Sequence, residues 1–450
     1  MKRVFSVLLV VVLLASVLGT HMMAQAYANM QVIGDANGDG RVNNRDLASL
    51  QQYINKWDVT VDETNADING DQQVNNRDLA LLQQSINGEV RVKATNPATK
   101  YVSLGAPAEA FYPSGVNRVA RCAMDMIIFD NRLYVGCGDF NRNTGATPVL
   151  SCPLDDLGNW SVEYTLPEEQ AGRFININGV LTIPGFDPLS RPTYSSYYER
   201  INGEWVQQEK LPDGLHNFDM AWYQGRMYAA IGADDGSTPL AYTEDGETYH
   251  NIPMIKEGKE LVFAENSVAR SCNLYVLGDE LYADFWYTVD ETTKSDFEMY
   301  HYNADKDCFE YVADLKTSTH GGLYSSAGLP LWEKVAINDK MFLTTGYLYY
   351  TTDFVKYTEV TMPNNAVVYD MQAFGGRLYL LTAYQSGKSY QVTVYSTTAA
   401  DPSDLRVEAT YTYALPPTAL VMNESNFFIG MGYWKETGAN GNGTILQVKR

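Results

Sequence analysis

Residues 35–55 read DANGDGRVNNRDLASLQQYIN, and residues 67–87 repeat this pattern 32 positions later as DINGDQQVNNRDLALLQQSIN. In both copies an oxygen-bearing side chain stands at positions 1, 3, 5, 9 and 12 of a twelve-residue loop, and position 7 offers its backbone carbonyl. This alternation surrounds a hard cation with oxygen ligands, so the sequence predicts two bound Ca²⁺ ions. The predicted ligands are Asp35, Asn37, Asp39, Arg41, Asn43 and Asp46, followed by Asp67, Asn69, Asp71, Gln73, Asn75 and Asp78.

An apolar pattern with helical spacing follows each loop, with Leu47, Leu50 and Ile54 after the first and an equivalent set after the second. Position 12 is Asp rather than Glu, and no entering helix precedes the first loop. With its tandem repeat, the segment 31–90 resembles a type I dockerin, a small all-α calcium-binding module. The resemblance implies docking on a scaffoldin cohesin, with loop positions 10 and 11 selecting the partner. Those residues are Asn44, Arg45, Asn76 and Arg77.

The first 26 residues have the order of a secretory signal peptide: Lys2 and Arg3, an apolar run over 4–18, and the small-residue site Ala24-Gln25-Ala26. A membrane anchor is the alternative, but about 15 apolar residues are short for a span of roughly 20. We therefore expect a secreted, extracellular chain with no membrane span, and the dockerin resemblance implies association with a cellulosome.

The formal net charge of -21 argues against nucleic acid or an anionic membrane as a partner. The five cysteines show neither a disulfide framework nor a zinc pattern, so we expect each to be a buried free thiol.

A short linker is expected at 91–99, and the remaining segment, 100–450, contains a degenerate repeat. Seven times an apolar strand runs through a two-residue turn into a second strand. The copies read MIIFDNRLYVG, FININGVLTIP, MAWYQGRMYAA, LYVLGDELYAD, KVAINDKMFLT, MQAFGGRLYLL and ALVMNESNFFI. Turn pairs such as Asn178-Gly179 and Gly375-Gly376 favour tight hairpins with positive φ.

The mean spacing of these copies is about 49 residues, close to one four-stranded propeller blade. The sequence therefore predicts a mainly β protein whose residues 100–450 form a seven-bladed β-propeller, with residues 100–104 supplying a strand that closes the ring. The hairpins 243–249 (TEDGETY) and 351–357 (TTDFVKY) resemble shortened Asp-boxes of sialidase-like propellers, a structural motif.

The aligned first positions of the seven copies are expected to ring the upper mouth of the central channel. Carboxylates there could act as general acid and base, or hold a metal, and the other polar residues could bind substrate. However, Asp125, Asp219 and Asp370 share the sequence frame D-M-x-x-[FY]-x-x-R-[LM]-Y, which Arg173 and Glu333 break. A residue that recurs in one frame also fits a structural tie between neighbouring blades. The predicted catalytic residues are Asp125, Asp219, Glu333 and Asp370, and Arg173 and Asn273 are predicted to bind substrate, with Thr418 at the seventh position.

Aromatic residues in the neighbouring loops could stack on sugar rings, although single aromatics more often pack internally. The predicted substrate-binding aromatics are Trp286, Tyr287, Tyr433 and Trp434, and Phe140, Tyr194, Tyr347 and Tyr384 border the same face.

Because most proteins that carry dockerins act on carbohydrate, the resemblance implies a glycoside hydrolase or polysaccharide lyase acting on plant cell-wall polysaccharide. The alternatives are a non-catalytic propeller that binds carbohydrate or protein, and a structural or regulatory scaffold component. We find no sequence motif of nucleophilic, zinc or nucleotide chemistry to decide between them.

Overall fold

The computed structural model describes residues 34–38, 42–68, 73–86, 99–113, 118–190, 194–212, 214–233, 236–264, 267–288, 295, 297–315, 333–433 and 440–450. The chain divides into two compact units, Met1–Pro97 and Ala98–Arg450, called here the helical unit and the propeller unit. The predicted signal peptide (1–26) and residues 91–98 of the predicted linker lie outside the described residues. Within the described ranges, no helix is long and apolar enough to span a membrane.

The helical unit contains α2 (Asn44–Ile54), α3 (Glu63–Ala66) and α4 (Asn76–Ile86). Each long helix begins at a loop asparagine, Asn43 or Asn75, whose side-chain oxygen accepts a hydrogen bond from the backbone amide two residues on, at 2.9 Å in both copies. In return, the carboxylates of Asp46 and Asp78 accept from the amides of these asparagines at 2.8 and 2.9 Å. Loop positions 9 and 12 therefore also cap the helices, which explains why a helix starts here in both copies.

Helices α2 and α4 pack against each other around a small apolar core. Leu50 and Leu82, at equivalent places in the two repeats, are fully buried in it, and Leu47, Ile54, Leu79 and Ile86 pack against it. This confirms the helical apolar pattern predicted after each loop. The other buried members of the core are Ala36, Val61, Ala66 and Ile68.

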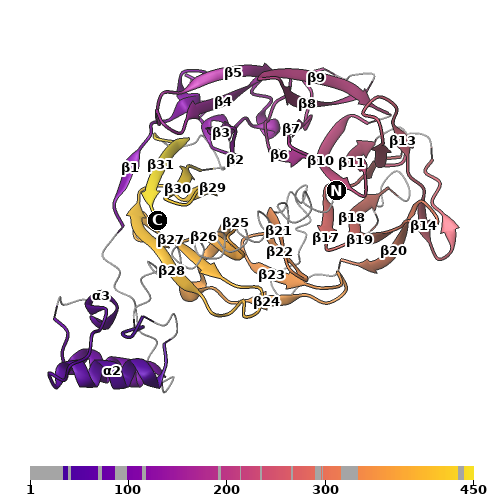
Figure 1. Cartoon of the computed structure of the whole chain (residues 1–450). Helices are drawn as coiled ribbons and strands as arrows, with labels where there is room; N and C mark the ends of the chain where they lie inside the picture. Colours follow the sequence, from indigo (N-terminus) through magenta and orange to yellow (C-terminus); the bar gives the residue numbers. More distant parts are fainter. Residues whose placement is uncertain are drawn as a thin grey trace, which may run out of the picture. The chain divides into compact units, whose positions relative to one another are not determined.

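The sheets of the propeller unit follow one another around a common centre, and the first strand of each lies innermost (Figure 1). Five of these sheets are four-stranded antiparallel blades. In order they contain β2 (Asp125–Phe129), β3 (Arg132–Gly136), β4 (Thr147–Pro153) and β5 (Ser161–Leu166); β6 (Ile175–Ile177), β7 (Val180–Pro184), β8 (Ser195–Ile201) and β9 (Glu204–Leu211); β21 (Glu333–Ile337), β22 (Lys340–Thr344), β23 (Leu348–Thr351) and β24 (Thr358–Val360); β25 (Val367–Phe374), β26 (Arg377–Ser386), β27 (Ser389–Thr397) and β28 (Arg406–Tyr413); and β29 (Pro417–Met422), β30 (Asn426–Met431), β31 (Thr444–Lys449) and β1 (Tyr101–Ser103).

The sixth sheet differs from the prediction of seven separate blades, because it contains eleven strands. The short strand β16 (Ala269–Arg270) pairs with both β11 and β18 and so joins two four-stranded runs into one sheet. The first run is β10 (His216–Tyr223), β11 (Arg226–Ala233), β12 (Leu240–Thr243) and β13 (His250–Asn251), and the second is β17 (Leu274–Leu277), β18 (Glu280–Tyr287), β19 (Glu298–Asn303) and β20 (Cys308–Asp314), beside which lie β14 (Met254–Lys256) and β15 (Lys259–Glu260).

The ring is closed by the strand expected at residues 100–104, since β1 pairs antiparallel with β31. The two-residue turns have the predicted backbone: φ is 49° at Asn178, 88° at Gly179, 57° at Gly375 and 76° at Gly376. Between the strands, four 3₁₀ turns occur among the described residues. They are η1 (Pro107–Glu109), η2 (Val119–Arg121), η3 (Phe140–Arg142) and η4 (Pro363–Asn365).

The five cysteines are free and buried in the propeller unit, which confirms that prediction. In both hairpins compared with Asp-boxes, the Asp side chain accepts from two successive backbone amides: Asp245 from Glu247 and Thr248 at 2.8 Å, and Asp353 from Val355 and Lys356 at 2.9 Å. These carboxylates therefore stabilise local turns.

Candidate functional site

The predicted calcium loops enclose buried carboxylates. Asp46 and Asp78, at position 12, have no exposed surface, and Asp35, at position 1, is 3% exposed. Each position-12 carboxylate also accepts from a backbone amide near the start of its own loop, Asp46 from Asn37 at 3.1 Å and Asp78 from Ile68 at 2.9 Å. Burying carboxylates is costly without a counter-charge, and a set of oxygen donors on such a loop fits Ca²⁺. The predicted ligands Asp39, Arg41, Asn69 and Asp71 lie outside the described residues.

The four predicted cohesin-contacting residues lie at the start of the two long helices. Asn44 and Arg45 open α2, Asn76 and Arg77 open α4, and all four side chains are exposed. Both copies therefore present the same pair of side chains in the same local setting.

In the propeller unit, the three Asp residues that share a sequence frame bond the neighbouring inner strand. Asp125 accepts from the amide of Phe174 at 2.6 Å, and Asp219 accepts from the amide of Leu274 at 2.8 Å. Asp370 accepts in the same way from the amide of Leu420. These contacts, each across 49 to 55 residues of sequence, confirm the interpretation of the shared frame as a tie between blades.

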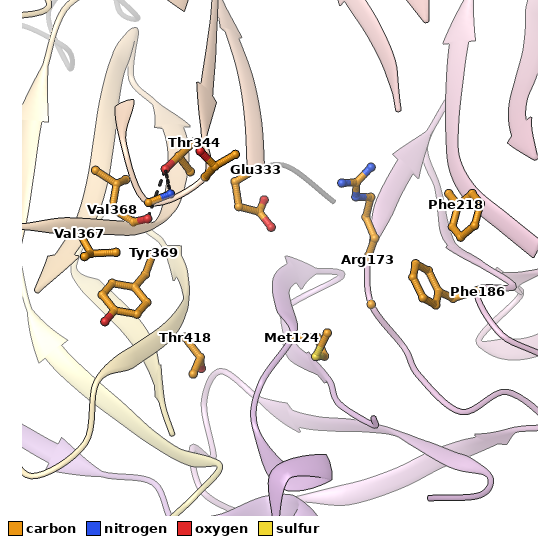
Figure 2. A pocket seen from close by; sticks show the side chains of 13 residues that line it. Met124, Arg173, Phe186, Phe218, Glu333, Thr344, Val367, Val368, Tyr369 and Thr418 are labelled. Atoms are coloured by element: carbon orange, nitrogen blue, oxygen red, sulfur yellow. Dashed lines mark hydrogen bonds between the residues drawn. The ribbon is translucent and has the colours of Figure 1, made fainter. Parts of the chain in front are cut away.

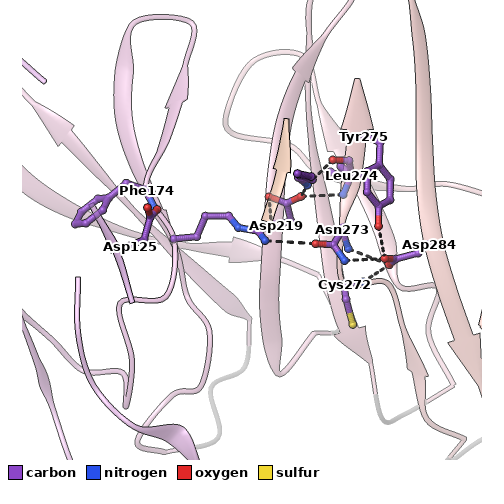
Figure 3. A network of polar contacts seen from close by, with 10 residues as sticks. Asp125, Phe174, Asp219, Cys272, Asn273, Leu274, Tyr275 and Asp284 are labelled. Atoms are coloured by element: carbon purple, nitrogen blue, oxygen red, sulfur yellow. Dashed lines mark hydrogen bonds and ion pairs between the residues drawn. The ribbon is translucent and has the colours of Figure 1, made fainter. Parts of the chain in front are cut away.

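Asp219 is also the centre of a buried ionic network (Figure 3). Its carboxylate pairs with Arg173, whose Nη1 lies 2.9 Å from Oδ1, and with the ammonium group of Lys334. Arg173 also donates to the Asn273 side chain at 3.4 Å, and Asn273 donates in turn to Asp284 at 2.7 Å. Asn273 is fully buried and thus serves this network from within the wall of the channel.

A pocket of about 330 Å³ lies at the end of the channel where the inner strands begin. Arg173 and Glu333, the two charged ring residues that break the shared frame, both line it. Figure 2 shows them on opposite sides, with the guanidinium and carboxylate groups directed into the space between them. The remaining lining residues are apolar, small or uncharged: Met124, Gly172, Phe186, Phe218, Thr344, Thr345, Gly346, Val367, Val368, Tyr369 and Thr418.

The channel carboxyl groups fall into two electrostatic classes. Burial and the neighbouring Glu333 raise the pKa of Asp125 to about 7, and burial likewise raises the pKa of Glu333 and Asp370. Burial also opposes ionisation of Asp219, but Arg173 and Lys334 outweigh it and lower its pKa. Asp219 is therefore held ionised by its two cationic partners, whereas burial favours the protonated form of the other three carboxyl groups.

Lys334 is a charged channel residue that the sequence comparison did not single out. Burial lowers its pKa to about 8 against the opposing influence of Asp219. Its position directly after Glu333 was the available signal, because the aligned copies carry apolar residues at this place. Among the described residues, no group of three His, Cys, Asp or Glu side chains is placed to hold a metal.

The predicted aromatic rim lies mostly away from the pocket lining. Trp286 is only 7% exposed and packs edge-on against Phe297. Tyr287 packs against Phe285 and Phe263, and Tyr433 shares a 2.5 Å hydrogen bond with Tyr390. Trp434 lies outside the described residues. Of the other aromatics expected to border this face, Tyr194 and Tyr347 are each 46% exposed.

His216, the first residue of β10, stacks on Phe218 with ring centroids 5.3 Å apart. Its Nδ1 lies 2.8 Å from the carbonyl oxygen of Phe186 and 3.6 Å from the carboxylate of Asp187. Since both phenylalanines line the pocket, His216 lies directly behind its wall.

Among solved structures, the chain is similar in fold to a PL25 polysaccharide lyase, an ulvan lyase bound to GlcA(1-4)Rha3S, with a TM-score of 0.41 and 11% identity over 78% of this chain and 94% of that one. The polysaccharide lyase Uly1 gives a TM-score of 0.38 and 6% identity over 74% and 90%. An acylaminoacyl peptidase from Pyrococcus horikoshii gives 0.37 and 10% over 68% and 48%. TM-scores this low carry no argument about the pocket's chemistry.

Comparison with curated proteins gives no match. The family model that matches is the dockerin type I domain, over residues 33–87, which include both predicted calcium loops and the three helices of the helical unit.

Proposed function

We propose that this protein is a secreted cellulosome component. Its dockerin docks on a scaffoldin cohesin in a calcium-dependent way, and its propeller acts on plant cell-wall polysaccharide as a glycoside hydrolase or polysaccharide lyase. The proposed action of the propeller on polysaccharide rests on the pocket at the channel mouth. There, Arg173 and Glu333 face each other, and the other walls are apolar or bear hydroxyl groups.

Docking rests on the dockerin match and on the duplicated loop and helix geometry. Asp35, Asp46, Asp67 and Asp78 are the described carboxylates that would hold the two ions. When bound, calcium supplies the positive charge that offsets these buried carboxylates and closes each loop onto its helix. The exposed pairs Asn44-Arg45 and Asn76-Arg77 would then meet the cohesin.

For the propeller we propose seven blades, of which two are joined through β16 into the eleven-stranded sheet. This assignment is supported by the two four-stranded runs β10–β13 and β17–β20 within that sheet. Each of these runs begins, like the five separate blades, with an inner strand that bears a ring residue within its first four residues or no more than two residues before its start.

Within the pocket, Glu333 is the candidate acid or base, because it lines the cavity and burial raises its pKa above the ordinary value of a glutamate. Arg173 would position the substrate by donating hydrogen bonds. Asp125, Asp219 and Asp370 would support the site from below through their ties to neighbouring strands and their charge.

A second candidate is a non-catalytic propeller that binds carbohydrate or protein at the same pocket. It is favoured by the commitment of three of the four predicted catalytic carboxyl groups to inter-blade hydrogen bonds. Hydrolysis usually needs two carboxyl groups beside the scissile bond.

The test is product analysis after prolonged incubation of the full chain, with calcium, on a panel of plant polysaccharides. Saturated oligosaccharides would identify a hydrolase, and unsaturated ends would identify a lyase. The Glu333→Gln variant should lose either activity, whereas Glu204→Gln, which changes an exposed residue on β9, should retain it. Binding to a glycan without any product would favour the second candidate, and the absence of both product and glycan binding from a folded chain would contradict a role on polysaccharide.

A further inference from the structure

The balance of charge around the pocket indicates which glycans it admits. Arg173 is the one cationic side chain among the described lining residues, and Glu333 is the one anionic side chain among them. Beneath them lie Asp125, Asp219, Asp370 and Lys334, so four carboxyl groups face two cations.

Both cations are already engaged by Asp219. The Arg173 guanidinium lies 2.9 Å from this carboxylate, and the Lys334 ammonium contacts its second oxygen. Lys334 also donates to the carbonyl of Leu274 and lies 5.1 Å from the centre of the Tyr275 ring, within the wall rather than in the pocket. Both cations therefore share one carboxylate as a counter-ion before any ligand enters, and Arg173 reaches the pocket as part of an ion pair.

Glu333 stands opposite this ion-paired cation. An ionised sugar carboxylate in the pocket would have to lie between the Arg173–Asp219 pair and the carboxyl group of Glu333. A buried anion needs a counter-charge, and a like charge directly opposite opposes its binding. A sugar hydroxyl meets neither obstacle, because it can accept from an Arg173 N–H and donate to a Glu333 oxygen.

The other walls favour the same class of ligand. Phe186, Phe218 and Tyr369 offer apolar ring surface, and Thr344, Thr345 and Thr418 offer hydroxyl groups. Thr418 Oγ1 has no hydrogen-bond partner among the described residues. Apolar surface with a few uncharged polar groups is the usual lining of a site for a neutral ligand.

We propose that the channel pocket selects an uncharged glycan segment and discriminates against uronate residues. This inference rests on the proposed function and narrows it. Because β-elimination requires a uronate, a pocket for neutral sugar leaves hydrolysis or binding as the propeller's action.

The experiment measures binding of the full chain, with calcium, to neutral cello-, xylo- and mannohexaose and to oligogalacturonate of the same length, by calorimetry at pH 8. We expect the preferred neutral hexasaccharide to bind at least roughly tenfold more tightly than the uronate, as like-charge opposition implies. In Glu333→Gln, the ratio of uronate affinity to neutral-sugar affinity should rise by about threefold or more, because the like charge opposite the uronate is removed. Glu204→Gln is the matched surface control.

The wild-type chain provides a second measurement that needs no variant. As pH falls from 8 to 5, Asp125, with a pKa of about 7, loses its negative charge and Lys334, with a pKa of about 8, gains positive charge. The raised pKa values of Glu333 and Asp370 act in the same direction, so uronate binding should strengthen, whereas binding of the neutral sugar should stay nearly flat. Uronate binding as tight as neutral binding at pH 8 would overturn the inference and leave the proposed function standing. Failure of a folded chain to bind either class would overturn both.

Discussion

The helical unit and the propeller unit are stabilised by different interactions. The described core of the helical unit consists of six buried residues, the largest of them Leu50 and Leu82, beside buried carboxylates. The propeller unit has several large apolar clusters between its sheets, and its carboxylates bond backbone amides and buried cations. A small core rarely suffices alone, so the helical unit should depend on its ions, and the propeller unit should not.

Calcium removal should produce the largest difference in stability between the two units. With EDTA, Asp46 and Asp78 lose the counter-charge that their burial requires, so we expect the helical unit to unfold. Hydrogen exchange followed by mass spectrometry on the full chain should show residues 42–86 losing protection while the strands of the propeller unit keep theirs. Cohesin binding should disappear together with this protection.

Asp46→Ala is the test variant, and Asp58→Ala is its matched control. Asp58 is exposed and outside both loops, so its variant should behave as the wild type. Retained protection of residues 42–86 in EDTA would show that the small core is sufficient and would remove the contrast between the units.

Within the propeller unit, Asp219→Ala should have the largest effect. It leaves Arg173 and Lys334, whose side chains are only 15% and 18% exposed, without their shared counter-ion and removes the tie to the Leu274 amide. Breaking a buried ion pair from one side typically costs about 3–5 kcal/mol of unfolding free energy. The measurement is urea unfolding followed by tryptophan fluorescence, with Asp279→Ala at an exposed turn as the control.

A loss below about 1 kcal/mol, the scale of an exposed ion pair, would mean that the network tolerates an unpaired cation. In that case Asp219 would become a better candidate for chemistry than for scaffolding. Calcium removal and Asp219→Ala therefore both test how much stability a unit loses when its charged side chains lose their counter-charge.

The extent to which the sequence predicted these two regions follows from how local their determinants are. The loop ligands and helix caps of the helical unit lie within twelve residues, and the φ > 0 turns, such as Asn178-Gly179, are set by adjacent residues. Their positions could be predicted directly. The two-residue strand β16 has no pattern of its own, and its pairing with both β11 and β18 depends on contacts between distant segments.

In the channel, too, the sequence predicted features set by a local pattern but not those set by contacts between distant segments. The repeated frame of Asp125, Asp219 and Asp370 correctly indicated ties between blades, and the frame-breaking Arg173 and Glu333 do line the pocket. Alignment could not show that Lys334 would turn toward Asp219, or that Trp286 would be buried against Phe297, because both depend on packing between strands. The proposed roles of these residues stay predictions.

The pH dependence of stability should have opposite signs in the two units. The folded-state pKa of Asp125, about 7, lies above its ordinary value of 3.8, so its contribution is complete below about pH 4 and is lost as pH rises through 7. Glu333 and Asp370, with raised pKa values, act in the same direction. Asp219, with a lowered pKa, loses its contribution only in stronger acid.

Calcium binding instead requires ionised carboxylates, so the helical unit should weaken as pH falls. Hydrogen exchange at pH 5, 6, 7 and 8, corrected for intrinsic exchange rates and at fixed calcium, would follow both units in one sample. Asp125→Asn should flatten the profile of the propeller unit alone. A propeller unit more stable at pH 8 than at pH 5 would refute the assignment of raised pKa values to this channel.

The smallest effect is expected when only one of the two equivalent Asn-Arg pairs of the helical unit is changed. Replacing Asn44 and Arg45 together by Ala should change cohesin affinity by less than about threefold, because the exposed pair Asn76-Arg77 presents the same groups at the start of α4. Replacing all four residues should abolish binding while calcium still protects the unit from exchange. Calorimetry with a panel of type I cohesins measures both variants, and the Asn76/Arg77 double variant is the symmetrical control. If either double variant alone lost binding, one copy would hold the whole docking surface, and the second loop would serve only to complete the fold.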